Sequence, residues 1–156
     1  MKTLDVEKIR SDFPMLQSII NGKPLVYLDN SATTHKPQQV IDSIVDFYTT
    51  TNANIHRGAY SLGQKASNRY ESARSSVKDF IGASSTDEII FTSGTTASLN
   101  LIAQSYGNMV VGRGDEVIIS EMEHHANIIP WLALCERKKA RLKVVSIDDQ
   151  GDLCLD

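Results

Sequence analysis

The chain has 156 residues, 41% of them hydrophobic, and a formal net charge of −3. This length predicts one globular domain, and the mild acidic balance with scattered basic residues argues against nucleic-acid binding. The longest apolar stretch, residues 128–135, contains Pro130 and is too short to cross a bilayer, so we expect no membrane segment. The N-terminus lacks the apolar core of a signal peptide, and Cys135 and Cys154 lack metal-binding spacing. Both observations favour a reduced, cytoplasmic chain.

The first half of the sequence predicts helices joined by polar loops. Helix 64–81 has the strongest pattern, because apolar residues recur along it every three or four positions, and Gly82 is suited to end it. Those apolar residues are Ala66, Tyr70, Ala73, Val77 and Phe80. The loop 51–63 before it is long enough to suggest a functional role. The other expected elements are a helix at 4–12, a turn at 21–24, a strand at 25–28, a loop at 29–36 and a helix at 37–50.

From residue 88 onward, apolar runs alternate with amphipathic stretches. Strands that alternate with helices predict an α/β fold with a mostly parallel sheet and right-handed crossovers. Asn127 is expected to cap one of these helices, which leaves Pro130 in its first turn, where proline is tolerated. The expected elements are strands at 88–92, 116–120 and 142–147, helices at 95–107 and 127–139, a turn at 149–151 and a short strand at 152–155.

The segment Gly94-Thr95-Thr96 lies between an expected strand and an expected helix. Glycine there permits a tight turn, and the amides and dipole at a helix N-terminus favour an anion, so the segment is a candidate phosphate site. The alternative is that Thr95 or Thr96 only caps the helix. The segment is neither a Walker loop nor a G-x-G-x-x-G dinucleotide motif, because the residues that define each are missing.

A pair of histidines, His124 and His125, follows the expected strand at 116–120. Ligands bind at the carboxyl ends of parallel strands, and an imidazole there can stack on a flat ring, exchange a proton or bind a metal. The metal interpretation is disfavoured because no third ligand stands at a workable spacing, so we predict no metal site. A loop histidine without a role is the remaining alternative.

A second cationic pair, His56 and Arg57, lies in the long polar loop. It can meet a carboxylate or phosphate, or it can belong to a solvated surface loop, and the residues alone favour neither. His35-Lys36 is similar to the His-Lys pair that carries covalently bound cofactors, but Pro37 follows at once, so we interpret it as a surface loop.

Several motifs in this order resemble the cysteine desulfurases, specifically their Suf-type branch, within the class-V aminotransferase superfamily. The resemblance covers essentially the whole chain. The motifs are Phe13-Pro14, the run from Asn21 to Thr34, the run from Asn54 to Gly58, the run from Phe91 to Thr96 and the run from Met122 to Trp131.

The resemblance implies a pyridoxal 5′-phosphate (PLP) enzyme of fold type I that converts L-cysteine to L-alanine and leaves a persulfide for iron–sulfur cluster assembly. It further implies a homodimer and a sulfur-acceptor protein of the Suf system. Gly94, Thr95 and Thr96 correspond to the phosphate-binding turn, with Thr96 as the main side-chain donor. His124 corresponds to the histidine that stacks on the pyridine ring and relays protons.

The resemblance also places residues of the first half near the active site. Ala32 and Thr33 correspond to a loop that lines the substrate pocket, and His56 and Arg57 to a loop close by. It implies an N-terminal arm at 1–24 followed by an incomplete transferase large domain at 25–156.

The sequence departs from the family pattern in two ways. Ser93 and Ala97 stand where many Suf-type enzymes have Arg and Glu. The family's covalent cofactor lysine, in a Ser-x-His-Lys motif, and its nucleophilic cysteine have no counterpart here. We therefore expect an N-terminal fragment that is inactive alone. The alternatives are a related class-V enzyme such as a selenocysteine lyase, a non-catalytic subunit partner and a stand-alone phosphate-binding domain.

Overall fold

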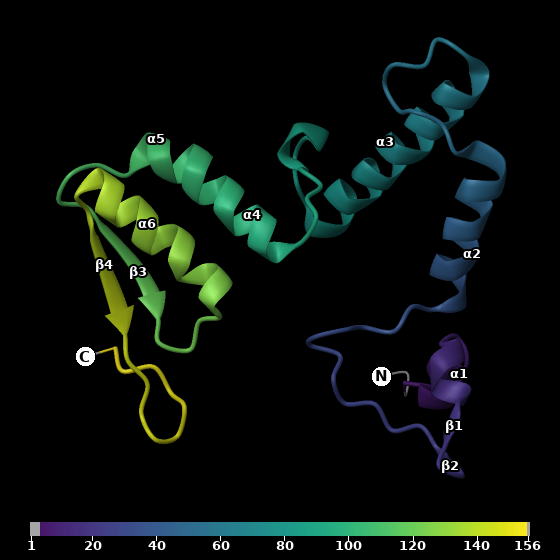
Figure 1. Cartoon of the computed structure of the whole chain (residues 1–156), viewed down its shortest axis with the longest axis horizontal. Coiled ribbons are helices and arrows are strands. Elements are labelled where there is room, and N and C mark those ends of the chain that lie inside the picture. The colour runs from purple at the N-terminus through teal and green to yellow at the C-terminus, as the bar shows by residue number, and fades with distance from the viewer. Residues whose placement is uncertain (1–3, 156) are drawn as a thin grey trace. The chain divides into compact units, whose positions relative to one another are not determined.

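The computed structural model describes residues 4–155 and divides the chain into two compact units, Met1–Ile89 and Ile90–Asp156. The first unit is mainly helical (Figure 1). Its elements are α1 (Val6–Ser11), the 3₁₀ turn η1 (Pro14–Gln17), β1 (Ile19–Ile20), β2 (Lys23–Pro24), α2 (Gln38–Asp46), the π-helical turn η2 (Phe47–Thr51), α3 (Ser61–Ile81) and the 3₁₀ turn η3 (Thr86–Glu88).

Local chemistry sets the ends of these elements. The carboxylate of Asp5 caps α1 by accepting a hydrogen bond from the Lys8 amide at 3.1 Å. Asn21 and Gly22 both have positive φ, which is the geometry that joins the short antiparallel strands β1 and β2. Gly82, with a φ of 72°, ends α3 in the left-handed conformation, as predicted.

The second unit contains the parallel strands. Its elements are α4 (Thr95–Ile102), the π-helical turn η4 (Ala103–Gly107), α5 (Asn108–Val110), β3 (Glu116–Ser120), the 3₁₀ turn η5 (His125–Asn127), α6 (Ile129–Lys138) and β4 (Arg141–Val145). Strands β3 and β4 pair in parallel from Glu116 opposite Arg141 to Ser120 opposite Val145. Helix α6 is the crossover between them and packs on both strands, which confirms the predicted βαβ arrangement (Figure 1).

The core of the second unit lies where α6 meets η4 and β3. Leu134 is fully buried there, with Ala103, Ile119 and Cys135. Gly107 permits this close packing, because a Cβ atom at its position would lie 2.8 Å from Cδ2 of Leu134. Leu134 is therefore the most deeply buried of the three side chains, with Pro130 and Cys135, that anchor the crossover helix.

Two predicted strands do not form. The segment 25–28 is irregular, and two of its apolar side chains lie in solvent, with Val26 77% and Leu28 89% exposed. The segment 88–92 begins in η3 and continues without a strand partner. An apolar run becomes a strand only when another strand accepts its backbone hydrogen bonds, and within residues 4–155 neither segment has one.

Other boundaries differ from the predictions. The helix expected at 95–107 is α-helical to Ile102 and then widens into η4. The strand expected at 142–147 ends at Val145. The strand expected at 152–155 is reduced to a single bridge between Ile147 and Leu153. Helix α3 begins at Ser61, so the polar loop before it is shorter than expected.

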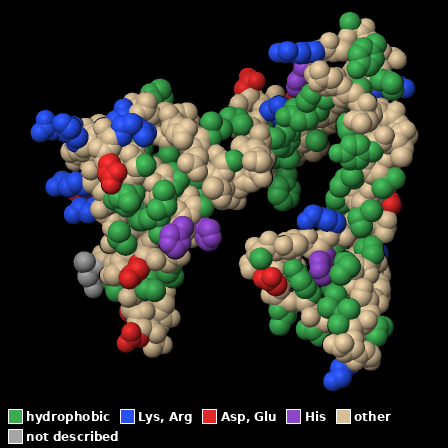
Figure 2. All heavy atoms as spheres, viewed as in Figure 1, with side chains coloured by type: hydrophobic (Ala, Val, Ile, Leu, Met, Phe, Trp, Pro, Cys, Tyr) green, Lys and Arg blue, Asp and Glu red, His purple; other side chains and the backbone are tan. Residues whose placement is uncertain are grey.

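The apolar face predicted for α3 is only partly covered. Ala66 is 1% exposed, whereas Val77 is 37% and Phe80 is 91% exposed. Apolar side chains are also visible along α2 in the space-filling view (Figure 2). Within residues 4–155, no helix combines the length and the apolar character needed to cross a bilayer.

Leu134 offers a direct test of the core. We expect Leu134→Ala to lower the free energy of unfolding by about 2–5 kcal/mol, because it leaves a cavity in tightly packed surroundings. The matched control is Leu132→Ala on the same helix, where the side chain is 40% exposed and the loss should be much smaller. Urea unfolding followed by fluorescence of Trp131, the one tryptophan, reports on this helix. Equal losses in the two variants would contradict the assignment of the core.

Candidate functional site

The turn before α4 is built around Gly94. Its φ of 150° and ψ of 176° are a backbone conformation that favours glycine. The hydroxyl of Thr92 bonds to the Gly94 carbonyl at 3.1 Å and lies 2.7 Å from the hydroxyl of Ser98. The Ser98 amide donates to the same carbonyl at 3.0 Å. Two hydroxyls and one amide therefore fix the orientation of Gly94.

This turn leaves hydrogen-bond donors for a ligand. Gly94 is the N-cap residue and has no side chain to cap the helix. The first amides of α4 have no acceptor within the helix, and its dipole adds partial positive charge. Within residues 4–155, the hydroxyls of Thr95 and Thr96 bond to no other group, and both residues are exposed. The threonines thus do not cap the helix, which removes the simplest alternative to anion binding.

The His124 side chain lies at the start of η5. Its Nδ1 atom accepts a hydrogen bond from the Ala126 amide at 3.1 Å, so His124 caps this 3₁₀ turn. The ring of His125 stands nearly perpendicular to it, with 6.4 Å between the centroids. Figure 2 shows the two histidine side chains of this unit side by side at the surface.

The cap determines which nitrogen of His124 carries a proton. Because the lone pair of Nδ1 is occupied by the Ala126 N–H, the neutral ring carries its hydrogen on Nε2. In this conformation the ring can donate a hydrogen bond from Nε2 or stack on a flat group. To accept a proton it must first break the bond to Ala126.

A chain of side-chain hydrogen bonds holds the segment on either side of His124. Glu123 accepts from Ser120 through Oε1 and from Asn127 Nδ2 through Oε2, both at 2.8 Å. The amide oxygen of Asn127 in turn accepts from Trp131 Nε1 at 2.8 Å. We call Ser120, Glu123, Asn127 and Trp131 the relay. It connects the end of β3 to the first turn of α6.

The prediction that Asn127 caps the helix is wrong. The N-cap position of α6 is Ile128, and it has no side-chain cap. The carboxamide of Asn127 instead bonds to Glu123 and Trp131. Pro130 lies in the first turn of α6, as predicted.

The relay also sets the charge of Glu123. The hydrogen bond from Asn127, followed by the one from Ser120, holds the pKa of the Glu123 carboxyl below its ordinary value. Glu123 is therefore a carboxylate at neutral pH, next in sequence to His124. Its negative charge disfavours an anion at its own position.

The phosphate-site candidate and His124 belong to neighbouring elements. Turn η5 packs against α4, and both turn η5 and η4 pack against α6. The elements that begin at Gly94 and at His124 therefore pack against each other within the second unit.

The first unit holds the other predicted site residues. Ala32 and Thr33 lie in an exposed turn that Tyr27 stabilises, since its hydroxyl donates to the Thr33 carbonyl at 2.7 Å. The Tyr27 ring stacks on His35 with 4.0 Å between centroids. His35 thus packs within its own loop, in agreement with its interpretation as a surface residue.

His56 and Arg57 lie in a separate loop of the first unit. His56 has a left-handed φ of 63°, and its Nε2 atom is 2.8 Å from Oε1 of Glu71 on α3. Arg57 is exposed, and within residues 4–155 its side chain forms no ion pair. The two residues of the pair therefore have different environments.

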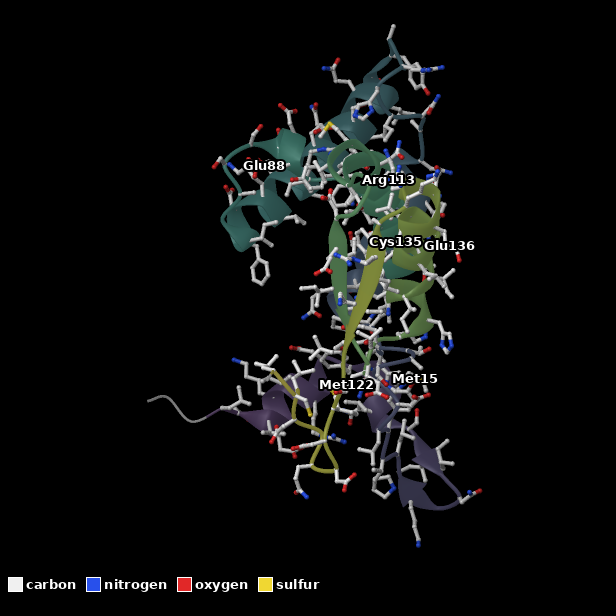
Figure 3. All side chains as sticks on the ribbon, turned by 90° about the vertical axis from the view of Figure 1, so that its left-hand side faces the viewer. Met15, Glu88, Arg113, Met122, Cys135 and Glu136 are labelled. Carbon is white, nitrogen blue, oxygen red and sulfur yellow. The ribbon has the colours of Figure 1, made fainter. Side chains whose placement is uncertain are left out.

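The environment of Cys135 is not that of a nucleophile. Cys135 is 3% exposed on α6, next to the exposed Glu136 (Figure 3), and burial raises the pKa of its thiol. Cys154 is exposed beyond β4. Within the described residues, no three His, Cys, Asp or Glu side chains are arranged to hold a metal ion.

Comparison with known proteins agrees with these observations. The family described as aminotransferase class-V matches residues 26–156. The chain belongs to the class-V aminotransferase family. It is 50% identical over 154 residues to a probable cysteine desulfurase of Mycolicibacterium paratuberculosis, covering 99% of this chain and 22% of that protein. It is 49% identical over 151 residues to a probable cysteine desulfurase of Staphylococcus aureus, covering 97% of this chain and 37% of that protein.

Solved structures give the same result. The apo cysteine desulfurase of Thermococcus onnurineus superposes with a TM-score of 0.85 at 35% identity, covering 98% of this chain and 36% of that one. The cysteine desulfurase CsdA of Escherichia coli superposes with a TM-score of 0.76, also at 35% identity, over 95% of this chain and 36% of that one. The predicted α/β fold class is confirmed. The chain spans between about a fifth and two fifths of the curated relatives it matches.

Asn127→Ala tests the relay. Because the pKa of Glu123 lies below its ordinary value, near 4.5, the relay stabilises the fold above that pH, and the stabilisation is lost as the pH falls through the folded pKa. Removing the Asn127 donor should raise the pKa of Glu123 toward its ordinary value and make the urea midpoint less sensitive to acid. Carboxyl ¹³C NMR titration measures the pKa directly.

The matched control is Asn100→Ala, because Asn100 donates only to the Thr96 carbonyl on α4. It should leave the titration of Glu123 unchanged. An unchanged Glu123 pKa in Asn127→Ala would show that the relay does not hold this carboxylate.

Proposed function

We propose that this chain supplies the phosphate-binding end and one ring-facing wall of a PLP-dependent cysteine desulfurase. The reaction is conversion of L-cysteine to L-alanine, with the sulfur left as an enzyme-bound persulfide. One observation carries the proposal: the helix α4 that follows the uncapped Gly94 packs against the turn η5 that follows His124, in a chain about half identical to proteins named cysteine desulfurase.

The donor set of the Gly94 turn fits a phosphate group. The helix N-terminus supplies amides in a fixed direction, and Thr95 and Thr96 add two hydroxyls without competing partners. Apart from Gly94 itself and its two neighbours in the chain, no atom of the described residues lies within 4 Å of where a Cβ on Gly94 would stand, so the turn is open on that side. We propose Gly94, Thr95 and Thr96 as the residues that hold the PLP phosphate.

His124 is proposed as the residue that faces the pyridine ring. When bound, PLP supplies a conjugated ring that takes up electron density from the substrate. The chain's part is to orient that ring: His124 presents the flat face of its imidazole and a proton on Nε2, and the relay keeps its segment in place.

The first unit is proposed to contribute to the substrate pocket. Ala32 and Thr33 would line it, and Arg57 would offer an exposed guanidinium to a carboxylate. We retain the division into an N-terminal arm at 1–24 and a transferase large domain at 25–156. The arm includes residues 1–3, which lie outside the described residues.

The wider assignments follow from the family likeness. We propose the Suf-type branch, a homodimer, delivery of sulfur to a Suf acceptor protein for iron–sulfur assembly, and a cytoplasmic location. The sequence holds no Ser-x-His-Lys motif, and Cys135 is buried, so we propose that this chain alone does not turn over cysteine.

Binding of PLP to the purified chain tests the phosphate site. We expect weak, non-covalent binding that shifts the ³¹P signal of PLP. Thr96→Val should weaken binding about tenfold, because a hydrogen bond to a charged group contributes about 1.5–3 kcal/mol. Thr86→Val in η3 is the matched control and should change nothing. Equal binding by the wild type, Thr96→Val and Gly94→Ala would refute the phosphate site.

The ring partner can be tested separately with the two adjacent histidines. His124→Ala should alter the absorbance and fluorescence of bound PLP while leaving its ³¹P shift in place. His125→Ala should leave both signals as in the wild type. The reverse pattern, with His125 controlling the ring signals, would exclude His124 as the ring partner.

A further inference from the structure

The loop that carries His56 and Arg57 has an unfavourable backbone conformation. His56 has a φ of 63°, in the left-handed region that non-glycine residues seldom adopt. Such a conformation persists only where surrounding interactions determine it, and it is often found at functional loops. The question is therefore which residues hold His56 in place.

Two side chains one turn apart on α3 bond to His56. The His56 amide donates to the hydroxyl of Ser67 at 2.8 Å, and its Nε2 atom lies 2.8 Å from Oε1 of Glu71. Ser67 uses its own proton to donate to the Gly63 carbonyl at 2.8 Å, which turns its lone pairs toward the His56 amide. Residues four apart on a helix share one face, so both contacts come from the same side.

Glu71 is itself fixed from the other side. Its Oε2 atom accepts from Arg74 Nε at 3.1 Å, so each carboxylate oxygen has its own partner. The Arg74 guanidinium lies over the Tyr70 ring, at 5.1 Å, and donates to the Ile89 carbonyl. The edge of the His56 ring meets the same tyrosine, with 5.5 Å between centroids. The charged and titratable groups around His56 are thus Glu71, Arg74 and Tyr70.

The other end of the loop is closed by two glycines. A Cβ on Gly63 would lie 2.9 Å from Cα of Gly58, so the loop backbone lies directly against the first turn of α3. The loop is therefore held both at Gly58 and at His56. Arg57, between these two points, has its side chain exposed.

We infer that Ser67 and Glu71 are positioning residues, which hold His56 in the left-handed conformation so that the adjacent Arg57 is presented in one orientation to an anion. His56 then acts as a structural link to α3 and is not the acid–base group of the pair. The identity of the anion, a substrate carboxylate, rests on the proposed function. The link between His56 and α3 does not depend on the proposed function.

The inference is tested on the full chain by NMR, without cofactor or substrate. In the left-handed conformation the amide and α protons of one residue are close, so His56 should show a strong intraresidue cross-peak. Glu71→Ala and Ser67→Ala should each weaken it and lower the Arg57 amide order parameter from about 0.85 to below about 0.6. Asp79→Asn, on the same helix and paired only with Lys78, is the matched control and should change neither signal.

A conservative variant and a pH profile distinguish positioning from general stabilisation. Glu71→Gln keeps an acceptor for His56 and should restore most of the cross-peak. The hydrogen bond from His56, aided by Arg74, holds the pKa of Glu71 below its ordinary value. The link is therefore intact above that value in the wild type and is lost as the pH falls through the lowered pKa. Glu71→Gln should not show this loss.

The result that overturns the inference is a full His56 cross-peak and an ordered Arg57 in both Glu71→Ala and Ser67→Ala. If either variant unfolds α3, the pH profile of the wild type against Glu71→Gln decides, and identical profiles refute the role of Glu71. These NMR measurements need neither PLP nor cysteine. Their outcome is therefore independent of the outcome of the PLP-binding test. Failure of the proposed function is thus distinguishable from failure of this inference.

Discussion

The carboxamide of Asn127 is the interaction on which the candidate site depends. It donates to Glu123 on one side of His124 and accepts from Trp131 on the first turns of α6. The turn that carries His124 is thereby fixed to the crossover helix, and the crossover helix is fixed by Leu134 in the core. A residue that stacks on a ring must have one orientation, and the segment that carries His124 is oriented by packing and hydrogen bonds outside the imidazole itself.

The candidate phosphate site is organised by a different set of interactions. Gly94 leaves the helix without a side-chain cap, while Thr92 and Ser98 hold the turn from behind. The donors at the front of the turn therefore have no internal partner. Ser93 and Ala97 take no part in this arrangement, because it uses the backbone of Gly94 and the hydroxyls of Thr92 and Ser98.

The sequence predicted most of the elements that depend on local patterns of residues. Periodicity and backbone restriction account for three of them: the long helix α3 with its end at Gly82, the parallel pair β3 and β4, and the proline in the first turn of α6. The strands expected at 25–28 and 88–92 were wrong because a strand requires a partner distant in sequence, which periodicity does not reveal. The role expected for Asn127 was wrong, and Ser67 and Glu71 were missed, for the same reason: their roles depend on which side chains the fold brings near them. A Ser and a Glu spaced four apart on a helix facing the His56 loop were the available signal for the last two.

We propose that residues 1–156 form part of a cysteine desulfurase site. The most direct measurement replaces the matching segment of the Staphylococcus aureus relative, 37% of that protein, with this chain and follows alanine formed from L-cysteine in the presence of PLP. We expect a folded chimera that forms alanine and loses this activity with His124→Ala while retaining PLP. A folded, PLP-loaded chimera that forms no alanine, or one that His124→Ala leaves fully active, would contradict it.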